Sequence, residues 1–326
     1  MKKILIISLI ILSFADSKAQ LFPTLGGQRA GISTAQFLKI GVGARAIAMG
    51  DAFIAVANDA SALYWNPAGL VQTEDNQVIL SHNEWLVEIK NDFIGASYHL
   101  SPNDVVGVSF VSLHTDDMPV TTETQPFGTG QFFSFGDIAF SLTYSKKMTD
   151  KFSFGGTVRY MEETLANLKM RGVLIDLGTL YWTGLGSTRF AVAITNFGNE
   201  LTPDGKVTLL SGKEKSDWQS FAPPTMFRLG FAFEPYQDDT QKITASVQLN
   251  HPNDNSENVS FGIEYGWKKI FYLRGGYKLN VEDQNFTFGA GINAPLGIAN
   301  VKFDYAYANF TKLGSAHRFS IIFGLY

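Results

Sequence analysis

The sequence predicts an all-β protein: a transmembrane antiparallel β-barrel of about 14 strands, with an N-terminal plug that contains short helices. Three observations predict this fold. The chain opens with an export signal, most of its length alternates apolar and polar residues, and the connections between the alternating segments are sorted by length. A composition of 45% apolar and only 17% charged residues fits a protein whose surface faces lipid.

Residues 1–19 have the pattern of a secretory signal peptide. Lys2 and Lys3 precede the apolar run 4–14, and Ala19 supplies a small residue for cleavage. The run is about half of the ~20 residues that a membrane-spanning helix needs, and no later stretch reaches that length. In lipid, only helices and closed barrels satisfy the backbone. The exported protein therefore either stays soluble in the periplasm or inserts into the cell outer membrane as a barrel, and the alternation of apolar and polar residues favours the barrel.

Residues 77–326 are expected to form this barrel. In the segment 259–267, the apolar face is Val259, Phe261, Ile263, Tyr265 and Trp267, and the other face is Ser260, Gly262, Glu264 and Gly266. Such alternation predicts strands with lipid on one side. Fourteen segments of this kind follow one another: 77–83, 91–100, 104–114, 134–146, 152–162, 172–183, 188–197, 225–234, 242–250, 257–267, 270–279, 285–294, 298–310 and 316–326.

The connections after even-numbered segments are mostly short, and those after odd-numbered segments are mostly longer, above all 115–133 and 198–224. Outer-membrane barrels place short turns in the periplasm and long loops outside. The alternative, a soluble periplasmic β-protein, gives no reason for this sorting. It would also leave the aromatic faces without an apolar partner.

Residues 20–76 are expected to fill the lumen, because fourteen strands enclose more space than their side chains fill. The run 41–70 is rich in Gly and Ala and poor in charge, which favours a buried element. Short helices are predicted at 33–38 and 58–64, and Pro67 should end the second one. Arg45 and Asp59 are costly to bury, so each should have a partner in the plug or the lumen wall.

The run 41–70 contains Gly43-Ala44-Arg45, Met49-Gly50, Asp59 and then Tyr64-Trp65-Asn66-Pro67-Ala68-Gly69-Leu70. This sequence resembles the PorV/PorQ family of outer-membrane proteins, distant relatives of the FadL transporters. The resemblance implies a part in the type IX secretion system, where PorV-like barrels collect cargo through its C-terminal signal domain at the translocon. We interpret the motif residues as structural parts of the plug: Gly43, Arg45, Met49, Gly50, Asp59, Asn66, Pro67 and Gly69.

The two longest outer loops carry many apolar residues for solvated segments. Either these loops cover their own side chains, as compact loops do, or they form a docking surface for a protein segment or a hydrophobic ligand. The candidate docking residues are Met118, Phe127, Phe132, Phe133, Trp218 and Phe221.

The alternative function is that of a FadL-like channel for the uptake of hydrophobic small molecules. In that case the plug shifts, and Gly155-Gly156 or Gly275-Gly276 marks a gap in the wall through which the molecule leaves. The residues expected to face the lumen are polar, which favours protein docking over an apolar conduit: Thr244, Gln248, Ser260, Glu264, Lys302 and Asp304.

Several other functions find no support in the sequence. A net charge of −4 without a basic cluster argues against nucleic-acid binding. The absence of cysteine excludes disulfides and thiolate ligands. The stretch 41–46 fits the dinucleotide fingerprint G-x-G-x-x-A, but no strand-helix alternation follows it. The five histidines lack metal-ligand spacing. We expect no enzyme activity, no cofactor and no metal.

Overall fold

The structure is a computed structural model that describes residues 31–209, 211–297 and 299–325. The predicted signal peptide, residues 1–19, lies outside the described residues, as do residues 20–30 of the expected plug. Among the described helices, none combines the length and the apolar character needed to cross a bilayer.

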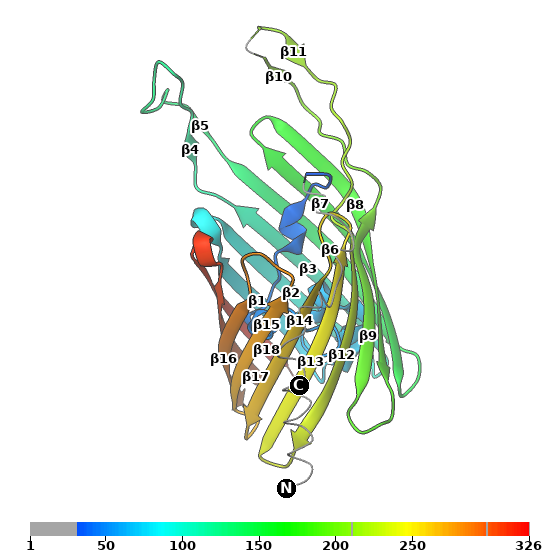
Figure 1. The fold of residues 1–326 in the computed structure, drawn as a ribbon. Helices are drawn as coiled ribbons and strands as arrows, with labels where there is room; N and C mark the ends of the chain where they lie inside the picture. Colours follow the sequence, from blue (N-terminus) through cyan, green and yellow to red (C-terminus); the bar gives the residue numbers. More distant parts are fainter. Residues whose placement is uncertain (1–30, 210, 298, 326) are drawn as a thin grey trace, which may run out of the picture.

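Fourteen antiparallel strands form a closed barrel (Figure 1), in which every strand pairs with its neighbour along the chain and β1 pairs with β18 to close the wall. All fourteen predicted segments are confirmed. The strands are β1 (Asn76–Glu84), β2 (Lys90–Ser101), β3 (Asp104–His114), β6 (Phe135–Lys147), β7 (Phe152–Leu165), β8 (Leu168–Trp182), β9 (Arg189–Gly198), β12 (Met226–Gln237), β13 (Gln241–Pro252), β14 (Asn258–Trp267), β15 (Phe271–Leu279), β16 (Phe286–Leu296), β17 (Ala299–Asn309) and β18 (Ser315–Leu325).

One boundary prediction is wrong. The expected loop between segments 152–162 and 172–183 is largely strand, because β7 and β8 continue to a tight turn at 166–167. Glu162 accepts hydrogen bonds from Lys169 and Arg171 across this extension, at 2.7 Å each. Beyond the membrane there is no lipid to demand an apolar face, so the alternation that identifies the other strands fades here.

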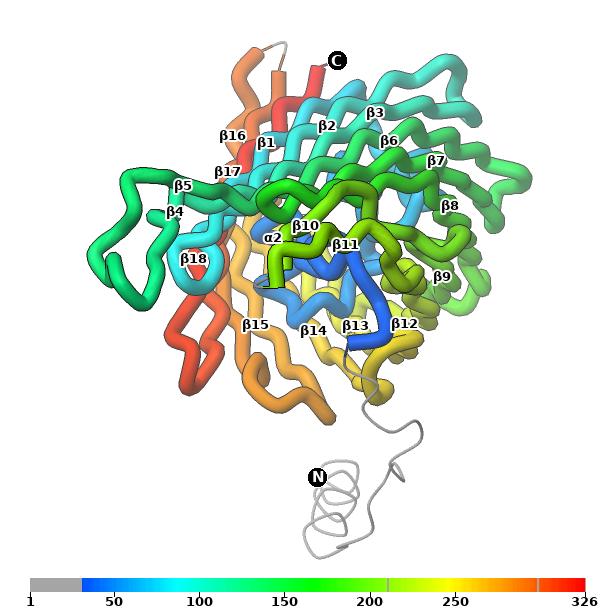
Figure 2. Tube along the Cα trace, turned by 90° about the horizontal axis from the view of Figure 1, so that it is seen from above, coloured from blue at the N-terminus to red at the C-terminus, as the bar shows by residue number. Residues whose placement is uncertain are grey.

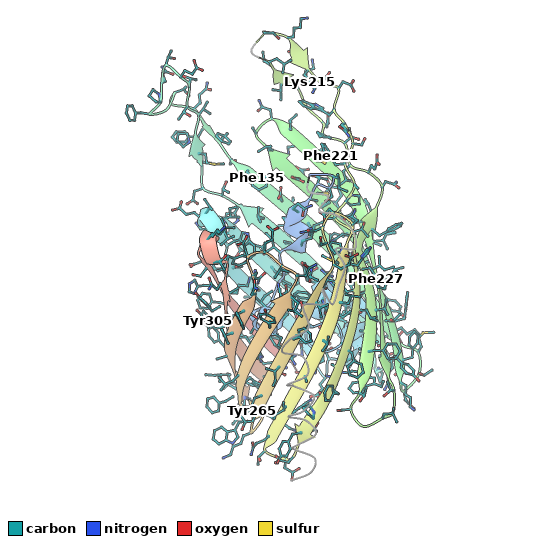
Figure 3. All side chains as sticks on the ribbon, in the orientation of Figure 1. Phe135, Lys215, Phe221, Phe227, Tyr265 and Tyr305 are labelled. Carbon is teal, nitrogen blue, oxygen red and sulfur yellow. The ribbon has the colours of Figure 1, made fainter. Side chains whose placement is uncertain are left out.

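The two faces of the wall divide as predicted. Phe261 and Ile263 are exposed on the outer face, whereas the lumen-facing residues Thr244, Gln248, Ser260, Glu264 and Asp304 are buried and Lys302 is half-buried. Aromatic side chains project from the outer surface, including Phe227, Tyr265 and Tyr305 (Figure 3). An apolar outer face with aromatic residues is what a barrel in lipid requires.

The two longest connections rise beyond the barrel at one end (Figure 1). One carries the short pair β4 (Met118–Pro119) and β5 (Phe132–Phe133), and the other carries β10 (Val207–Thr208) and β11 (Glu214–Lys215). In the view from above (Figure 2), β10 and β11 lie over the mouth of the barrel, and β4 and β5 lie to one side. Long loops mark the extracellular side, so this is the outer end. Two short helices, η3 (Leu86–Glu88) and η4 (Thr311–Leu313), lie in connections of the same end.

Residues 31–75, called the plug below, lie inside the barrel (Figure 2) and contain η1 (Gln36–Lys39), α2 (Ala44–Ala48), α3 (Ala62–Trp65) and η2 (Pro67–Gln72). The structure confirms short helices near both predicted positions, but α2 and η2 were not predicted. Asn66 ends α3, and its side chain accepts a hydrogen bond from the Ala68 N–H to begin η2, so the break at Pro67 is confirmed. The centre of the plug is apolar: Phe53 and Trp65 meet edge to face at 6.1 Å.

Candidate functional site

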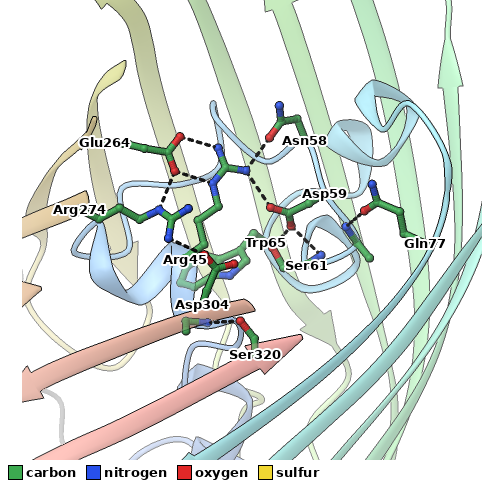
Figure 4. Close-up of polar contacts among 12 residues, drawn as sticks. Arg45, Asn58, Asp59, Ser61, Trp65, Gln77, Glu264, Arg274, Asp304 and Ser320 are labelled. Atoms are coloured by element: carbon green, nitrogen blue, oxygen red, sulfur yellow. Dashed lines mark hydrogen bonds and ion pairs between the residues drawn. The ribbon is translucent and has the colours of Figure 1, made fainter. Parts of the chain in front are cut away.

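An ionic network fixes α2 of the plug to the barrel wall (Figure 4). The Arg45 guanidinium donates to both oxygens of Glu264, at 2.8 and 3.0 Å, and to Asp59 at 2.8 Å. From the wall, Arg274 donates to Glu264 at 2.7 Å and to Asp304 at 2.6 Å. Each charge therefore has the partner that its burial demands. The network joins two parts of the plug to β14, β15 and β17.

Asp59 stays ionised in this buried place. Burial alone raises the pKa of Asp59, but the Arg45 guanidinium and the Ser61 hydroxyl lower it below its usual range. Ser61 donates to Asp59 from both its hydroxyl, at 2.5 Å, and its backbone N–H, at 3.0 Å. Asp59 thus joins the charge of Arg45 to Ser61 at the start of α3.

Polar side chains of the wall also hold the plug backbone. Gln248 of β13 accepts from the N–H groups of Phe53 and Ile54, both at 3.0 Å. Arg189 of β9 donates from Nε to the Ala55 carbonyl at 2.7 Å. Ser153 of β7 donates to the Ala68 carbonyl at 2.9 Å, and further contacts of this kind come from Gln77, Ser81, Thr287 and Ser320. The polar lumen face predicted from the sequence therefore satisfies the backbone of the plug.

The glycine pairs Gly155-Gly156 and Gly275-Gly276 do not mark a gap in the wall. Gly155 and Gly276 face the lumen, where a Cβ atom would collide with the plug backbone at Pro67 and at Gly50. Both strands are regularly paired through these positions, without a register shift. The gap hypothesis is wrong at both sites. The glycines let the plug backbone approach the wall more closely than any side chain would allow.

The outer end of the plug is anchored separately. Asp254, in the loop between β13 and β14, accepts from Lys39 at 2.7 Å, from Gln36 at 2.6 Å and from the Ser33 hydroxyl. Glu163 of β7 accepts from the Thr34 hydroxyl at 2.8 Å and the Ala35 N–H at 2.9 Å. Two carboxylates from different parts of the rim therefore hold the segment 33–39, an anchor that the sequence did not indicate.

The structure places the residues of the plug motif together. Gly43 precedes α2 with φ of 78°, Gly50 follows it with φ of 65°, and Met49 and Asn66 are fully buried. Asn66 donates to the carbonyls of Ile54 at 2.9 Å and Thr179 at 3.2 Å, which ties the plug to β8. Arg45 and Asp59 lie in the network described above, and Pro67 and Gly69 begin η2. No βαβ unit surrounds the stretch 41–46 in the described chain, so the dinucleotide fingerprint is a chance match.

The six candidate docking residues separate into two groups. Phe127 is 100% and Phe132 is 64% exposed, on the loop that carries β4 and β5, where Met118 pairs with Phe133. Trp218 and Phe221 are half-buried in the other loop, which folds on itself. The Trp218 indole donates to the Gly205 carbonyl at 2.9 Å, and the backbone of Phe221 pairs with that of Leu201. Self-coverage therefore describes the second loop, and the first leaves two phenyl rings free.

A family model described as type IX secretion system protein PorV matches residues 25–253 of this chain. No curated protein matches the sequence. The chain is similar in fold to the toluene transporter TbuX of Ralstonia pickettii, with 13% identity, a TM-score of 0.54, and coverage of 88% of this chain and 99% of that chain. It is also similar to the P. putida toluene transporter TodX (12%, TM-score 0.57, coverage 88% and 99%) and to the CymD monoaromatic hydrocarbon channel (14%, TM-score 0.60, coverage 88% and 98%).

Proposed function

The chain belongs to the PorV family of type IX secretion system proteins, and we propose that it docks secreted cargo or translocon proteins through its outer loops. Family and fold are those of outer-membrane barrels, which gives the chain a membrane lipid environment. The proposal includes export by the signal peptide at 1–19, a plug domain over 20–76 and a barrel domain over 77–326. Docking needs only surface contact, so it involves no catalytic step.

The observation that carries the proposal is the exposure of Phe127 and Phe132 on a loop that rises beyond the barrel. Exposed aromatic side chains above the membrane have no lipid to cover them, and apolar groups left in water mark interaction sites. The loop is held by its own backbone hydrogen bonds: the Val120 N–H donates to the Gln131 carbonyl and the Thr129 N–H to the Val120 carbonyl, both at 2.8 Å, and Thr122 pairs with Gln125. It therefore presents the two phenyl rings from a paired segment without covering them.

Uptake of hydrophobic molecules is the second candidate, favoured by the similarity in fold to toluene transporters. In this chain a conduit would have to pass a plug that the ionic network and many wall side chains hold in place. The lumen wall against the plug is mostly polar. These features support docking over transport.

The test is a co-purification from the native outer membrane of wild type and of the double variant Phe127→Ser/Phe132→Ser, with proteins and lipids identified by mass spectrometry. We expect wild type to bring down translocon proteins or proteins that share a C-terminal signal domain, and the variant to lose them. Val87→Ser is the matched control at the same end, since Val87 is 83% exposed in a different loop. Leu185→Ser is the control at the opposite end, with Leu185 77% exposed.

Capture that persists in the double variant would place docking elsewhere on the molecule. A barrel that purifies alone, with a stoichiometric hydrophobic molecule, would instead support uptake. Deleting residues 198–224 separates the contribution of the second loop, which we expect to be smaller because its aromatic residues are used to fold it.

A further inference from the structure

Arg318 of β18 is a buried cation that forms no salt bridge with the described residues. It faces the lumen, is 2% exposed, and its Nε and Nη1 atoms have no hydrogen-bond acceptor in the described chain. Its guanidinium lies 4.9 Å from the centre of the Trp85 ring, which offers a weak cation–π contact but no counter-ion.

Four other arginines of the lumen have carboxylate partners, and a fifth, Arg228, donates to the Thr195 hydroxyl. Arg45 and Arg274 share Glu264, Arg159 pairs with Asp176 at 2.7 Å, and Arg189 pairs with Glu234 at 2.8 Å. A buried charge without a counter-ion is strongly unfavourable, so chains pair such groups or neutralise them. Within the described residues, the chain supplies a carboxylate in these four cases and none to Arg318.

Two asparagines extend the unpaired group. Asn83 of β1 lies directly opposite Arg318, and Asn91 of β2 lies directly opposite Asn83. Directly opposed residues on one face have Cβ atoms about 5 Å apart, so the three side chains are neighbours. Both asparagines are 2% exposed, and neither Nδ2 atom has a partner in the described chain. The cluster therefore presents four unpaired donor nitrogens, Arg318 Nε and Nη1 with the two amide nitrogens, against one unpaired oxygen, Asn83 Oδ1.

Aromatic and polar side chains lie next to the cluster. Trp85 packs edge to face against Phe310, with ring centres 4.8 Å apart, beside the Arg318 guanidinium. Two residues further along the same strand faces, Ser81 and Ser320 accept hydrogen bonds from the plug backbone. Water would occupy the donors but leave the charge uncompensated, whereas an anion satisfies both.

We propose that Arg318, Asn83 and Asn91 form a binding site for a small oxyanion, either an inorganic ion or the carboxylate end of a small molecule. The site is independent of the docking loops, so the proposed function can fail without affecting it.

The experiment titrates the purified full-length protein in detergent with inorganic phosphate and, separately, with hexanoate, following binding by calorimetry and the thermal midpoint by tryptophan fluorescence. We expect saturable binding of at least one probe and a higher midpoint. Arg318→Gln should weaken this binding by about tenfold or more, because it removes a charge-assisted hydrogen-bond donor. Asn83→Asp should abolish binding while the protein stays folded, because it supplies the missing carboxylate from the chain itself.

Arg228→Gln is the matched control. Like Arg318, Arg228 is buried in the lumen and has no carboxylate partner in the described chain. Unlike Arg318, it donates a hydrogen bond to Thr195, and it lies on β12 in another part of the wall. Its variant should bind like wild type. Unchanged binding in Arg318→Gln and Asn83→Asp would overturn the proposal. Failure of wild type to bind either probe would overturn it as well, because the donors would then hold only water. Binding of phosphate alone identifies an inorganic ion, and binding of hexanoate identifies a carboxylate.

Discussion

Arg45 links the plug to the barrel wall through buried ion pairs. Its side chain connects Asp59 in the plug to Glu264 in the wall, and both carboxylates are buried. Removing one member of a buried ionic group leaves the others with uncompensated charge, which costs more than the pair contributes. The consequences for stability should therefore be large at this residue.

We predict that Arg45→Met lowers the free energy of unfolding by about 3–5 kcal/mol, the usual cost of breaking a buried ion pair. Unfolding in denaturant, followed by tryptophan fluorescence, measures this change. Arg171→Met is the control: Arg171 pairs with Glu162 on the exposed extension of β7 and β8, and its loss should leave the midpoint unchanged. Equal midpoints for Arg45→Met and wild type would show that the network does not hold the plug.

The neighbouring glycines Gly275 and Gly276 allow an internally controlled test of how closely the plug fits. A Cβ on Gly276 would collide with the backbone of Gly50, whereas a Cβ on Gly275 would meet only the side chain of Ile263 at 3.8 Å, a normal contact. We predict that Gly276→Ala costs about 1–3 kcal/mol by overpacking, and that it loosens the plug enough to raise uptake of small solutes. Gly275→Ala should behave like wild type in unfolding and in a liposome-swelling assay. Similar effects of both substitutions would mean that the strand, not the plug, is what responds.

At the residue scale, the sequence predicts that Arg45 and Asp59 have partners, because burial cost applies to any charge. It does not predict which partners. Glu264 is 219 positions from Arg45 in the chain, and no local pattern relates the two. The same holds for Asp254, which is 215 positions from Lys39, and for the unpaired Arg318. Contacts across a closed barrel depend on register, which is set only when the whole wall has formed.

Among the elements, the strands were predictable, whereas only two of the four described plug helices, η1 and α3, were predicted. Each strand has lipid on one side and polar plug contacts on the other, which enforces the strict alternation seen at 259–267. The helix α2 has only five residues and lies between Gly43 and Gly50, so neither length nor amphipathic pattern identifies it. Wall side chains bind both ends of α2: Ser320 accepts a hydrogen bond from the Ala44 N–H, and Thr287 donates one to the Ala48 carbonyl. These contacts, which the local sequence does not encode, hold the helix in place.

The anchor of η1 should respond to pH. Burial raises the pKa of Asp254, but the hydrogen bonds from Lys39, Ser33 and Gln36 lower it below its usual value. A carboxyl whose pKa is lower in the folded state stabilises that state above its ordinary pKa of about 4, and this contribution disappears as the pH falls through the lowered value. We predict that hydrogen exchange in the segment 33–39 accelerates, relative to intrinsic rates, only below about pH 4.

Asp254→Asn should show the same acceleration at neutral pH, because the neutral amide lacks the charge that holds Lys39. Asp238→Asn is the control. Its carboxyl also has a lowered pKa, about 2, through hydrogen bonds from Tyr236 and the backbone N–H groups of Thr240 and Gln241, but it lies in a turn at the other end of the barrel. If both variants leave the segment 33–39 protected at neutral pH, Glu163 alone is sufficient to anchor it.

At the scale of the whole molecule, the two candidate functions differ in whether the plug must move. Docking uses the outer loops and leaves the plug in place, whereas uptake requires a path through a lumen that the plug now fills. The chain contains no cysteine, so an engineered pair would form a single defined disulfide. A Cβ built on Gly230 of β12 lies 3.4 Å from the Cβ of Ala55 in the plug, close to the separation of about 3.5–4.5 Å in disulfides.

We predict that Gly230→Cys/Ala55→Cys, combined with Ile54→Ala to remove a carbon 2.6 Å from the new Cβ, locks the plug to the wall when oxidised. The oxidised and reduced forms of this one protein are matched in every other respect. If the barrel docks cargo, both forms should capture the same partners in the co-purification. If it transports hydrophobic molecules, oxidation should stop uptake and reduction should restore it. Capture of partners by the reduced form alone would contradict both expectations, because it would mean that docking at the loops is coupled to movement of the plug.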